Sequence, residues 1–255
     1  MRPPTPPALA ALAASAALAC LPSPRLQPRA AEELRRGYAF LGEGDLERAE
    51  VAFAHARAYH PDLPEAWNGS GVVAHRRGDR AVARAHFARA LQGNGEFAEA
   101  LVNLGAVALE ERRFGEAESL LRDALAIDPD LAVARLDLAR TLLRRGLDEP
   151  AARAERWAAA RTEYLHLLET RPASADAWHD LGFLDFEAGR YDRAEGEYRR
   201  AVALSGTTAA RHGLCIALVR LDRCAEAAAE CRRCLEADPG AEACRRSLAG
   251  AEACR

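Results

Sequence analysis

The chain repeats one order of small and bulky residues six times, at a spacing of 34 residues that lengthens once. Each unit has a small residue, a second small residue 12 positions later and a bulky residue 4 positions after that. The first three units hold these residues: Gly37, Ala49 and Phe53; Gly71, Ala83 and Phe87; Gly105, Ala117 and Leu121. A period of 34 is typical of stacked helical hairpins. Small residues suit such hairpins because they allow two helices to cross closely.

Proline and tryptophan mark the borders of these units. Proline follows the second predicted helix of four units, at Pro61, Pro129, Pro172 and Pro239, since proline cannot continue a helix. Two first helices open with the spacing WxxxG, at Trp67–Gly71 and Trp178–Gly182. At these residues the chain resembles the tetratricopeptide repeat (TPR) family, from about Ala30 to the C-terminus. The resemblance implies an all-α protein, a right-handed α-solenoid of about six TPR helix-turn-helix repeats plus a C-terminal capping helix.

The period places the solenoid at residues 31–255. We expect repeats at about 30–63, 64–97, 98–131, 132–174, 175–207 and 208–241, and a terminal helix at 242–255. The fourth repeat is nine residues too long, with the surplus at 147–155. We expect Asp148 to cap a second helix that starts early and projects, with Pro150 in its first turn. Repeat insertions often lie on a binding face, and a length variant without function is the alternative.

The first 19 residues have the features of a signal peptide. A basic start precedes the apolar run Ala8–Ala19, which is too short to span a bilayer, and Ala17-Leu18-Ala19 forms a cleavage region before Cys20. This arrangement resembles a bacterial lipoprotein signal, which implies a lipid on Cys20. Because no Asp follows Cys20, the enteric sorting rule implies the outer membrane. Residues 20–30 form a proline-rich tether. Ordinary secretory cleavage at the same place is the alternative.

Six further cysteines follow residue 214. Residues equidistant from the turn of a helical hairpin lie at the same height, because both helices rise equally per residue. About a turn centred near Arg223, Cys215 and Cys231 lie at equal height. About a turn centred near Pro239, the pairs at equal height are Cys224–Cys254 and Cys234–Cys244. We therefore predict three disulfides that fasten the terminal helix, in an export compartment where such bonds persist. Other connectivities remain open, and so does the simpler interpretation that cysteine replaces alanine at small buried positions.

Motifs for catalysis or metal binding are missing from the sequence. Seven histidines form no HExxH pattern: His55, His60, His75, His86, His166, His179 and His212. The spacing CxxC at Cys231 and Cys234 lies in mid-helix, and Leu235 stands where a covalent haem site has histidine. All 35 basic residues are arginine, and the net charge of -3 argues against nucleic acid. We expect no enzymatic activity, no cofactor, no metal and no nucleic-acid partner.

The resemblance implies a concave face lined by the first helix of each repeat. The corresponding groove positions are Leu34, Tyr38, Leu41, Asn68, Val72, His75, Val102, Asn103, Ala106, Leu109, Leu136, Arg140, Leu143, His179, Phe183, Phe186, His212, Ile216 and Val219. A strip this apolar favours a bound peptide or amphipathic helix, whose backbone Asn68, Asn103 and Arg140 would hold. We expect some of these residues to pack between neighbouring helices instead.

These observations favour a non-enzymatic scaffold that holds a protein partner at the outer membrane and faces the periplasm. The six repeats and the lipidation signal together resemble the pilotin lipoproteins of type IV pili, of the Tgl and PilW kind. That resemblance implies assistance to secretin assembly. One alternative is a generic periplasmic assembly factor for another envelope complex, cytochrome maturation or polysaccharide export. Another is a cytoplasmic scaffold with an uncleaved N-terminus, against which the number of cysteines argues.

Overall fold

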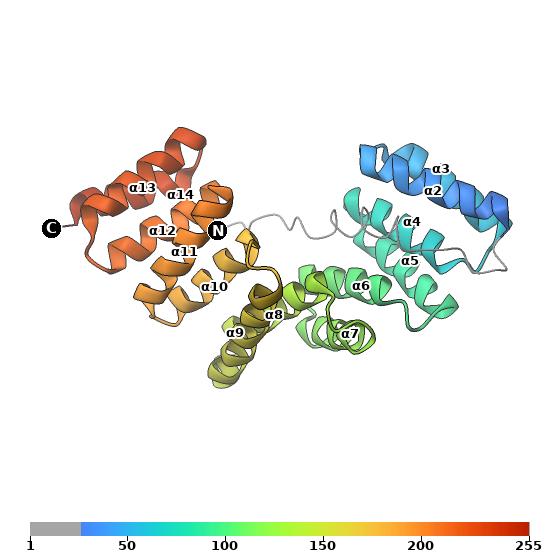
Figure 1. The fold of residues 1–255 in the computed structure, drawn as a ribbon, viewed down its shortest axis with the longest axis horizontal. Coiled ribbons are helices and arrows are strands. Elements are labelled where there is room, and N and C mark those ends of the chain that lie inside the picture. The colour runs from blue at the N-terminus through green and yellow to red at the C-terminus, as the bar shows by residue number, and fades with distance from the viewer. Residues whose placement is uncertain (1–26, 255) are drawn as a thin grey trace. The chain divides into compact units, whose positions relative to one another are not determined.

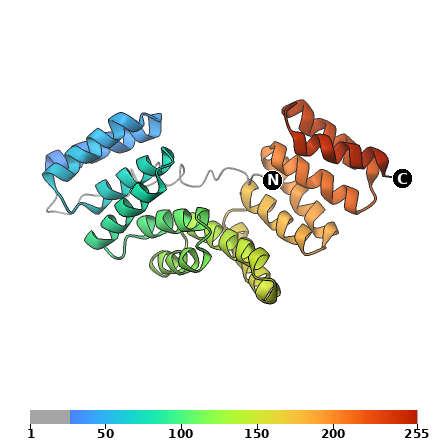
Figure 2. The same ribbon diagram turned by 180° about the vertical axis from the view of Figure 1, so that it is seen from behind.

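The computed structural model describes residues 27–254, so the predicted signal peptide, Cys20 and most of the tether lie outside the described residues. Over this range the chain forms 13 α-helices and one short 3-10 helix, and no strand. The all-α TPR solenoid predicted from the sequence is confirmed. The chain divides into two compact units, one ending at Thr141 and one beginning at Leu142, which we call unit 1 and unit 2 (Figures 1 and 2).

Unit 1 is a series of helical hairpins stacked in chain order. Its helices are α2 (Pro28–Glu43), α3 (Leu46–Tyr59), α4 (Pro64–Arg76), α5 (Arg80–Gly93), α6 (Ala98–Glu110), α7 (Phe114–Ile127) and the first part of α8 (Ala132–Asp148). Each hairpin pairs a first helix with a second, as α2 does with α3, and the second helix packs on the next hairpin. The first helices α2, α4 and α6 contact one another in order, so they form a continuous layer.

Unit 2 repeats this arrangement. It consists of the end of α8, the 3-10 helix η2 (Pro150–Ala152), α9 (Arg153–Thr170), α10 (Ala175–Glu187), α11 (Tyr191–Ser205), α12 (Thr208–Arg220), α13 (Cys224–Ala237) and α14 (Glu242–Ala253). The first helices α10 and α12 contact each other, and α14 packs against both α12 and α13. Within unit 2, α10, α12 and α14 therefore form a layer of their own.

Glycines on the first helices receive the bulky residues of the second helices. A Cβ atom added to Gly37 would lie 2.5 Å from Cε1 of Phe53, which is completely buried. In unit 2, Tyr198 covers Gly182 and Gly213 in the same way, with Cδ1 3.0 Å and 2.7 Å from the added Cβ atoms. Any larger residue at these glycines would displace a buried ring. The recurring small residue is thus a requirement of close helix crossing.

Five of the hairpin turns, those of α2–α3, α4–α5, α6–α7, α10–α11 and α12–α13, hold one residue in the left-handed conformation. Gly44, Gly78 and Gly189 occupy this position with φ of 80°, 87° and 75°. Arg112 and Asp222 occupy the corresponding turns with φ of 60° and 57°. Glycine adopts this conformation without steric strain, whereas arginine and aspartate carry a cost.

The surplus of the fourth repeat lengthens both of its helices. α8 has 17 residues where α4, α6 and α10 have 13, and α9 has 18 where α3, α5 and α7 have 14. The second helix begins early, as expected, but the predicted cap is wrong. Asp148 is the last residue of α8, and Pro150 opens η2 rather than α9. The helix ends there because the residue before a proline is disfavoured in the helical conformation.

Candidate functional site

In unit 1, most of the predicted groove residues are buried. Exposed fractions are 8% or less for Leu34, Leu41, Asn68, Val72, Val102, Asn103, Ala106 and Leu109. This result differs from the prediction of an open groove. The side chains fill the seams between α2, α4 and α6, because the first helices of consecutive repeats contact one another directly.

Two of these residues were predicted to hold a peptide backbone, and they bind each other instead. Asn103 Nδ2 donates a hydrogen bond of 2.9 Å to Asn68 Oδ1, which joins α6 to α4. Both side chains are buried, so their hydrogen bond is sheltered from water. The hydrogen bond between the two amides therefore stabilises the packing of consecutive repeats in unit 1.

Polar groups at the edge of this layer also have partners within unit 1. His75 Nε2 lies 3.0 Å from Glu110 Oε1, and Arg80 Nε donates to Glu110 Oε2 at 2.8 Å. Burial acts to raise the pKa of Glu110, but the hydrogen bonds from His75 and Arg80 prevail and lower it below its usual value. Tyr38 donates a hydrogen bond of 3.1 Å to the backbone oxygen of Glu65. The polar groups of this edge thus stabilise unit 1 itself.

α8 carries the groove positions nearest the division between the units. Leu136 is partly exposed, and Arg140 Nη1 lies 3.8 Å from Asp137 Oδ1. Leu143, which belongs to unit 2, is 5% exposed. Arg140 is therefore engaged with its own helix.

Unit 2 presents a more open layer of first helices. Phe183 and Phe186 on α10, with Ile216 and Val219 on α12, are partly exposed. Phe183, Phe186 and Val219 rest on the buried core of this unit, whose centre includes Tyr198. We call these four residues the α10–α12 face. Neighbouring partly exposed apolar residues of this kind are typical of a protein-binding surface.

Two histidines lie on the same helices as this face. His179 Nδ1 is 3.1 Å from Asp180 Oδ1, and its ring lies 5.7 Å from the ring of Tyr198. His212 Nε2 is 3.1 Å from Ser247 Oγ on α14. Burial lowers the pKa of His212, and the positive charge of Arg246 and the proximity of His179 lower it further. The neutral form of His212 is therefore favoured near pH 7.

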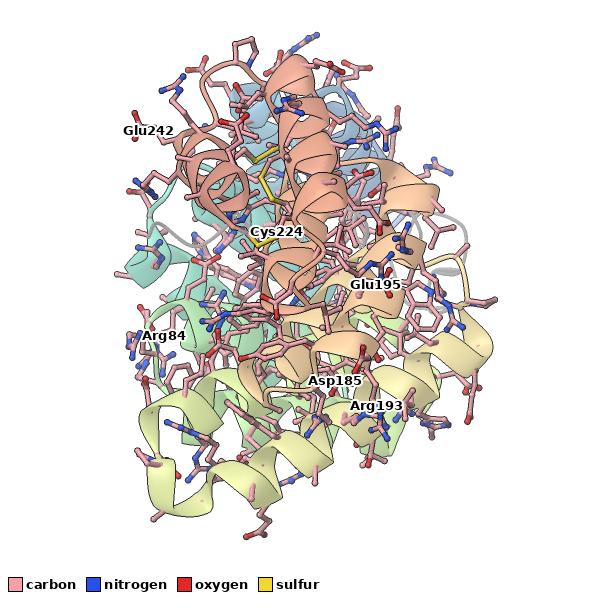
Figure 3. All side chains as sticks on the ribbon, turned by 90° about the vertical axis from the view of Figure 1, so that its left-hand side faces the viewer. Arg84, Asp185, Arg193, Glu195, Cys224 and Glu242 are labelled. Carbon is pink, nitrogen blue, oxygen red and sulfur yellow. A yellow bond between two sulfur atoms is a disulfide. The ribbon has the colours of Figure 1, made fainter. Side chains whose placement is uncertain are left out.

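The cysteines of α12, α13 and α14 are joined in three pairs (Figure 3). The bonds are Cys215–Cys231, Cys224–Cys254 and Cys234–Cys244, which are the pairs matched by helix height. Their Cα atoms are 5.6, 5.6 and 6.3 Å apart, within the range that a disulfide needs. The last two bonds tie α14 to α13.

The sequence contains a signal that explains the place of the first bond. Cys215 precedes Cys231 by 16 residues, as Gly37 precedes Phe53 and Gly182 precedes Tyr198. The bond therefore occupies the position at which the first, second and fifth repeats place a ring over a glycine. A sulfur–sulfur bond needs the same close approach of two helices that the glycine allows.

No group of three or more histidine, cysteine or acidic residues within residues 27–254 is arranged to hold a metal ion. None of the helices in this range has the length and apolar character needed to cross a membrane.

The α-solenoid is similar to several proteins of known structure. PilW, described as a widely conserved type IV pilus biogenesis factor, superposes with a TM-score of 0.75 at 17% identity, over 87% of this chain and 99% of PilW. PilF of Pseudomonas aeruginosa gives a TM-score of 0.74 at 18% identity, over 87% of this chain and 97% of PilF. The APC/C hetero-tetramer Cut9–Hcn1 gives 0.75 at 15% identity, over 88% of this chain but 43% of the matched chain. At these identities the likeness concerns the fold.

A curated relative shows a closer likeness in sequence. Cellulose synthase 2 operon protein C of Komagataeibacter xylinus is 31% identical over 206 residues. The match covers 77% of this chain, which spans only 16% of the length of that relative.

Models of the tetratricopeptide repeat match most of the described chain. One matches residues 34–95, 150–208 and 180–242, and a second matches residues 108–154. These ranges include helices of both units, with the same hairpins that the structure shows. The chain belongs to the tetratricopeptide repeat family.

Proposed function

We propose that this protein is a non-enzymatic scaffold of the bacterial cell envelope that binds a partner protein on the α10–α12 face. Repeats of this family typically serve as protein-interaction scaffolds. The observation that carries the proposal is the partial exposure of four apolar residues on two helices that contact each other, namely Phe183, Phe186, Ile216 and Val219. An amphipathic helix or extended peptide of the partner would place its apolar side chains against this row.

The cysteines and the N-terminus support an envelope location. Three disulfides on α12, α13 and α14 persist in an oxidising compartment and are rare in the cytosol. The sequence around Cys20 has the order of a lipoprotein signal. We propose that a lipid on Cys20 holds the protein at the outer membrane, that the solenoid faces the periplasm, and that the disulfides form after export.

For the partner, we propose a component of secretin assembly, which makes this protein a pilotin. PilW and PilF support this choice because each is matched over nearly its full length. Their likeness therefore extends to the size of the array as well as to its repeat. The lipidation signal supports the same assignment.

A second candidate is an assembly factor for polysaccharide export. The relative from the cellulose synthase operon supports it, because its 31% identity exceeds the identity to either pilus protein. This chain corresponds to a small part of that relative, so it would supply a scaffold segment of a larger assembly.

Crosslinking followed by a pull-down from the native envelope tests the proposal. The full-length protein should recover a secretin subunit, and a Cys20→Ala variant should leave the membrane fraction and lose that subunit. Recovery of polysaccharide-synthesis components would favour the second candidate. A Cys20→Ala protein that still fractionates with the membrane would contradict the lipid anchor.

A paired substitution tests the role of the α10–α12 face. Phe183→Ala with Ile216→Ala should abolish recovery of the partner while the helical signal in circular dichroism stays unchanged. The matched control is Leu204→Ala, because Leu204 is an exposed apolar residue of α11 in the same unit. Equal recovery by the paired variant and the control would contradict binding at this face.

A further inference from the structure

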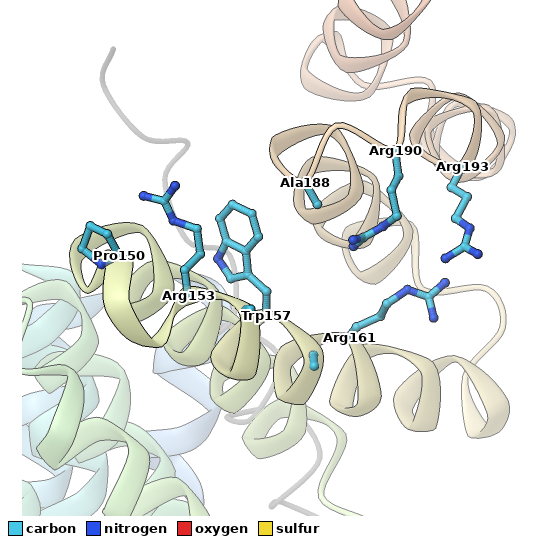
Figure 4. Close-up of a pocket in the computed structure, with 9 residues that line it drawn as sticks. Pro150, Arg153, Trp157, Arg161, Ala188, Arg190 and Arg193 are labelled. Atoms are coloured by element: carbon cyan, nitrogen blue, oxygen red, sulfur yellow. The ribbon is translucent and has the colours of Figure 1, made fainter.

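A pocket rich in arginine lies where the long helix α9 passes the turn between α10 and α11. Its volume is about 530 Å³, and it lies entirely within unit 2. The lining residues are Pro150, Arg153, Ala154, Trp157, Ala158, Arg161, Ala188, Arg190 and Arg193. We call it the arginine pocket (Figure 4). Its wall contains four guanidinium groups and no carboxylate.

One buried carboxylate balances part of this charge from behind the wall. Asp185 is fully buried, and its Oδ1 accepts hydrogen bonds from Arg190 Nε at 3.0 Å and Nη2 at 2.5 Å. The same oxygen lies 3.6 Å from Arg161 Nε. Glu197 lies beside Asp185, and burial together with the Asp185 charge raises the pKa of Glu197 to about 8. Glu197 is therefore largely protonated at pH 7 and adds little negative charge.

The other two arginines have no acidic partner among residues 27–254. Arg193 is exposed and forms no ion pair in this range. Arg153 Nε donates to the backbone oxygen of Gly146 at 3.2 Å, and its guanidinium carbon lies 5.3 Å from the Trp157 ring centre. The position of the Trp157 ring is fixed by a hydrogen bond of 3.2 Å that its Nε1 donates to the backbone oxygen of Leu143. Asp185 thus offsets one of the four guanidinium charges, through its contacts with Arg190 and Arg161.

A second pocket shows that unbalanced charge is not a general result of the arginine-rich composition. It lies between α2 and α3, in unit 1, with a volume of about 360 Å³. Its arginines have acidic partners nearby: Arg36 lies 2.7 Å from Glu33, and Arg48 lies 2.6 Å from Asp45. The surplus of positive charge therefore distinguishes the arginine pocket.

The spacing of the arginines indicates the kind of anion that fits. Arg153 and Arg161 are eight residues apart on α9, so their backbones are separated by about 12 Å along the helix axis. Figure 4 shows Arg161 and Arg193 pointing toward one another, while Arg153 lies at the other end beside Trp157. The arrangement suits at least two anionic groups on one chain.

We propose that the arginine pocket binds an acidic segment of a protein partner through two or more carboxylates. The choice of a protein partner rests on the scaffold function proposed above. Arg161 and Arg193 would hold one carboxylate, and Arg153 would hold a second, with the planar fork geometry that guanidinium offers to carboxylate oxygens. Residues 1–26 contain no aspartate or glutamate, so that segment of the chain supplies no acidic side chain.

The proposal also explains the irregular fourth repeat. The surplus of nine residues includes three that line the pocket, Pro150, Arg153 and Ala154. The extra turn at the start of α9, which begins at Arg153, brings Arg153 and Trp157 to the pocket. A repeat of ordinary length would lack this end of the site. The insertion thus adds a charged site to an otherwise regular array.

Fluorescence anisotropy with a labelled peptide tests this site in the purified full chain. The probe is a peptide of alternating glutamate and alanine, and its matched control has glutamine at every glutamate. Only the glutamate peptide should bind, and its affinity should fall as salt rises from about 50 to about 300 mM, because exposed charge pairs are screened. Equal binding of both peptides would overturn the proposal.

Substitutions locate the binding. The double variant Arg153→Gln with Arg193→Gln should weaken binding of the glutamate peptide roughly tenfold or more. Arg246→Gln is the control, since Arg246 is an exposed arginine of α14 in the same unit, and it should have little effect. Circular dichroism checks the fold, and Arg193→Lys, which keeps the charge, should bind with intermediate affinity. Unchanged binding by the double variant would overturn the assignment.

Competition distinguishes the class of anion. Inorganic phosphate should displace the peptide no more strongly than a simple salt does at the same ionic strength. Specific displacement by phosphate would show a site for one oxyanion, and tighter binding of a single-stranded oligonucleotide would show a nucleic-acid site. Either result would overturn the proposal. The envelope pull-down uses different variants. A failure of the arginine pocket to bind the peptide can therefore be distinguished from a failure of the α10–α12 face to bind its partner.

Discussion

Unit 1 and unit 2 are built from the same repeat, but they are stabilised by different chemistry. In unit 1, Phe53 and Phe87 pack against glycines, and Asn68 bonds to Asn103. In unit 2, the ring of Tyr198 still packs over glycines, but the last repeat does not follow this arrangement. A disulfide takes the place of the ring in the last repeat, and an acidic pair is buried beside the arginine pocket. The repeat pattern itself therefore serves packing, and departures from it coincide with the disulfides and with the proposed arginine pocket.

The two units also differ in how far their first helices expose apolar side chains. Most groove positions on α2, α4 and α6 are buried, and Asn68 bonds to Asn103, so this layer of unit 1 offers little apolar surface to a partner. The α10–α12 face leaves four large apolar residues partly exposed. One family of repeats thus yields a structural half and a half with candidate binding surfaces.

The largest effect should come from removing a ring of unit 1. Phe53→Ala should lower the free energy of unfolding by about 3–5 kcal/mol, because the cavity lies against two glycines that cannot fill it. Urea unfolding followed by circular dichroism measures the change. Val51→Ala is the control, since Val51 is an exposed apolar residue of the same helix. A Phe53→Ala protein as stable as this control would contradict the packing role of the rings that lie over the glycines.

The disulfide that replaces the ring in unit 2 should matter slightly less. Replacing Cys215 and Cys231 together by alanine should lower the stability of unit 2 by about 2–4 kcal/mol, since the bond restricts the unfolded chain. A reductant should lower the stability of unit 2 in the wild type and leave unit 1 unchanged. Mass spectra of peptides with and without reduction check the three pairs. Six free thiols in protein isolated from the envelope would contradict all three bonds.

The buried acids of unit 2 should make its stability fall as pH rises. The pKa of Glu197 is raised from 4.5 to about 8 in the folded protein, so between these pH values the folded state binds more protons than the unfolded state. The free energy of unfolding therefore decreases across this window and levels off above it. Glu197→Gln should remove the decrease and stabilise unit 2 at pH 8.

A buried glutamate of unit 1 supplies the comparison. Glu118 is similarly buried but forms an ion pair of 2.5 Å with Arg122. Glu118→Gln should therefore give no gain at pH 8. Thermal unfolding of both variants across pH 4 to pH 9 measures the difference. A gain of equal size in the two variants would show that Asp185 has no special effect on Glu197.

The smallest effect concerns the turn between α12 and α13. Asp222 has a φ of 57°, where three other hairpins have Gly44, Gly78 and Gly189. Asp222→Gly should raise stability by about 0.5–1 kcal/mol because glycine adopts this conformation without strain. Gly189→Ala, at the corresponding turn between α10 and α11, should lower stability by about 1 kcal/mol. Destabilisation by Asp222→Gly would show that the aspartate side chain outweighs the strain of its backbone.

Much of the fold is readable from the sequence because its determinants are local. The period of 34 and the spacing of 16 between Gly37 and Phe53 follow from helix geometry and from the room available at a crossing. The match of Cys224 with Cys254 and of Cys234 with Cys244 follows from the equal rise of two helices about one turn. Residues close in sequence, or symmetric about a turn, are placed by regular geometry alone.

The sites are different because they depend on how separate helices pack. No sequence pattern announces that Asn68 bonds to Asn103, or that Phe183 and Ile216 stay partly exposed while Val72 and Val102 are buried. The arginine pocket joins Arg153 to Arg193 across forty residues and three helices, and its charge depends on the burial of Asp185 and Glu197. The sequence by itself determined the repeat, the helices and the height of the cysteines. Only the tertiary structure decided which side chains meet water and which charges stay unbalanced, because desolvation depends on every neighbour that the packing brings.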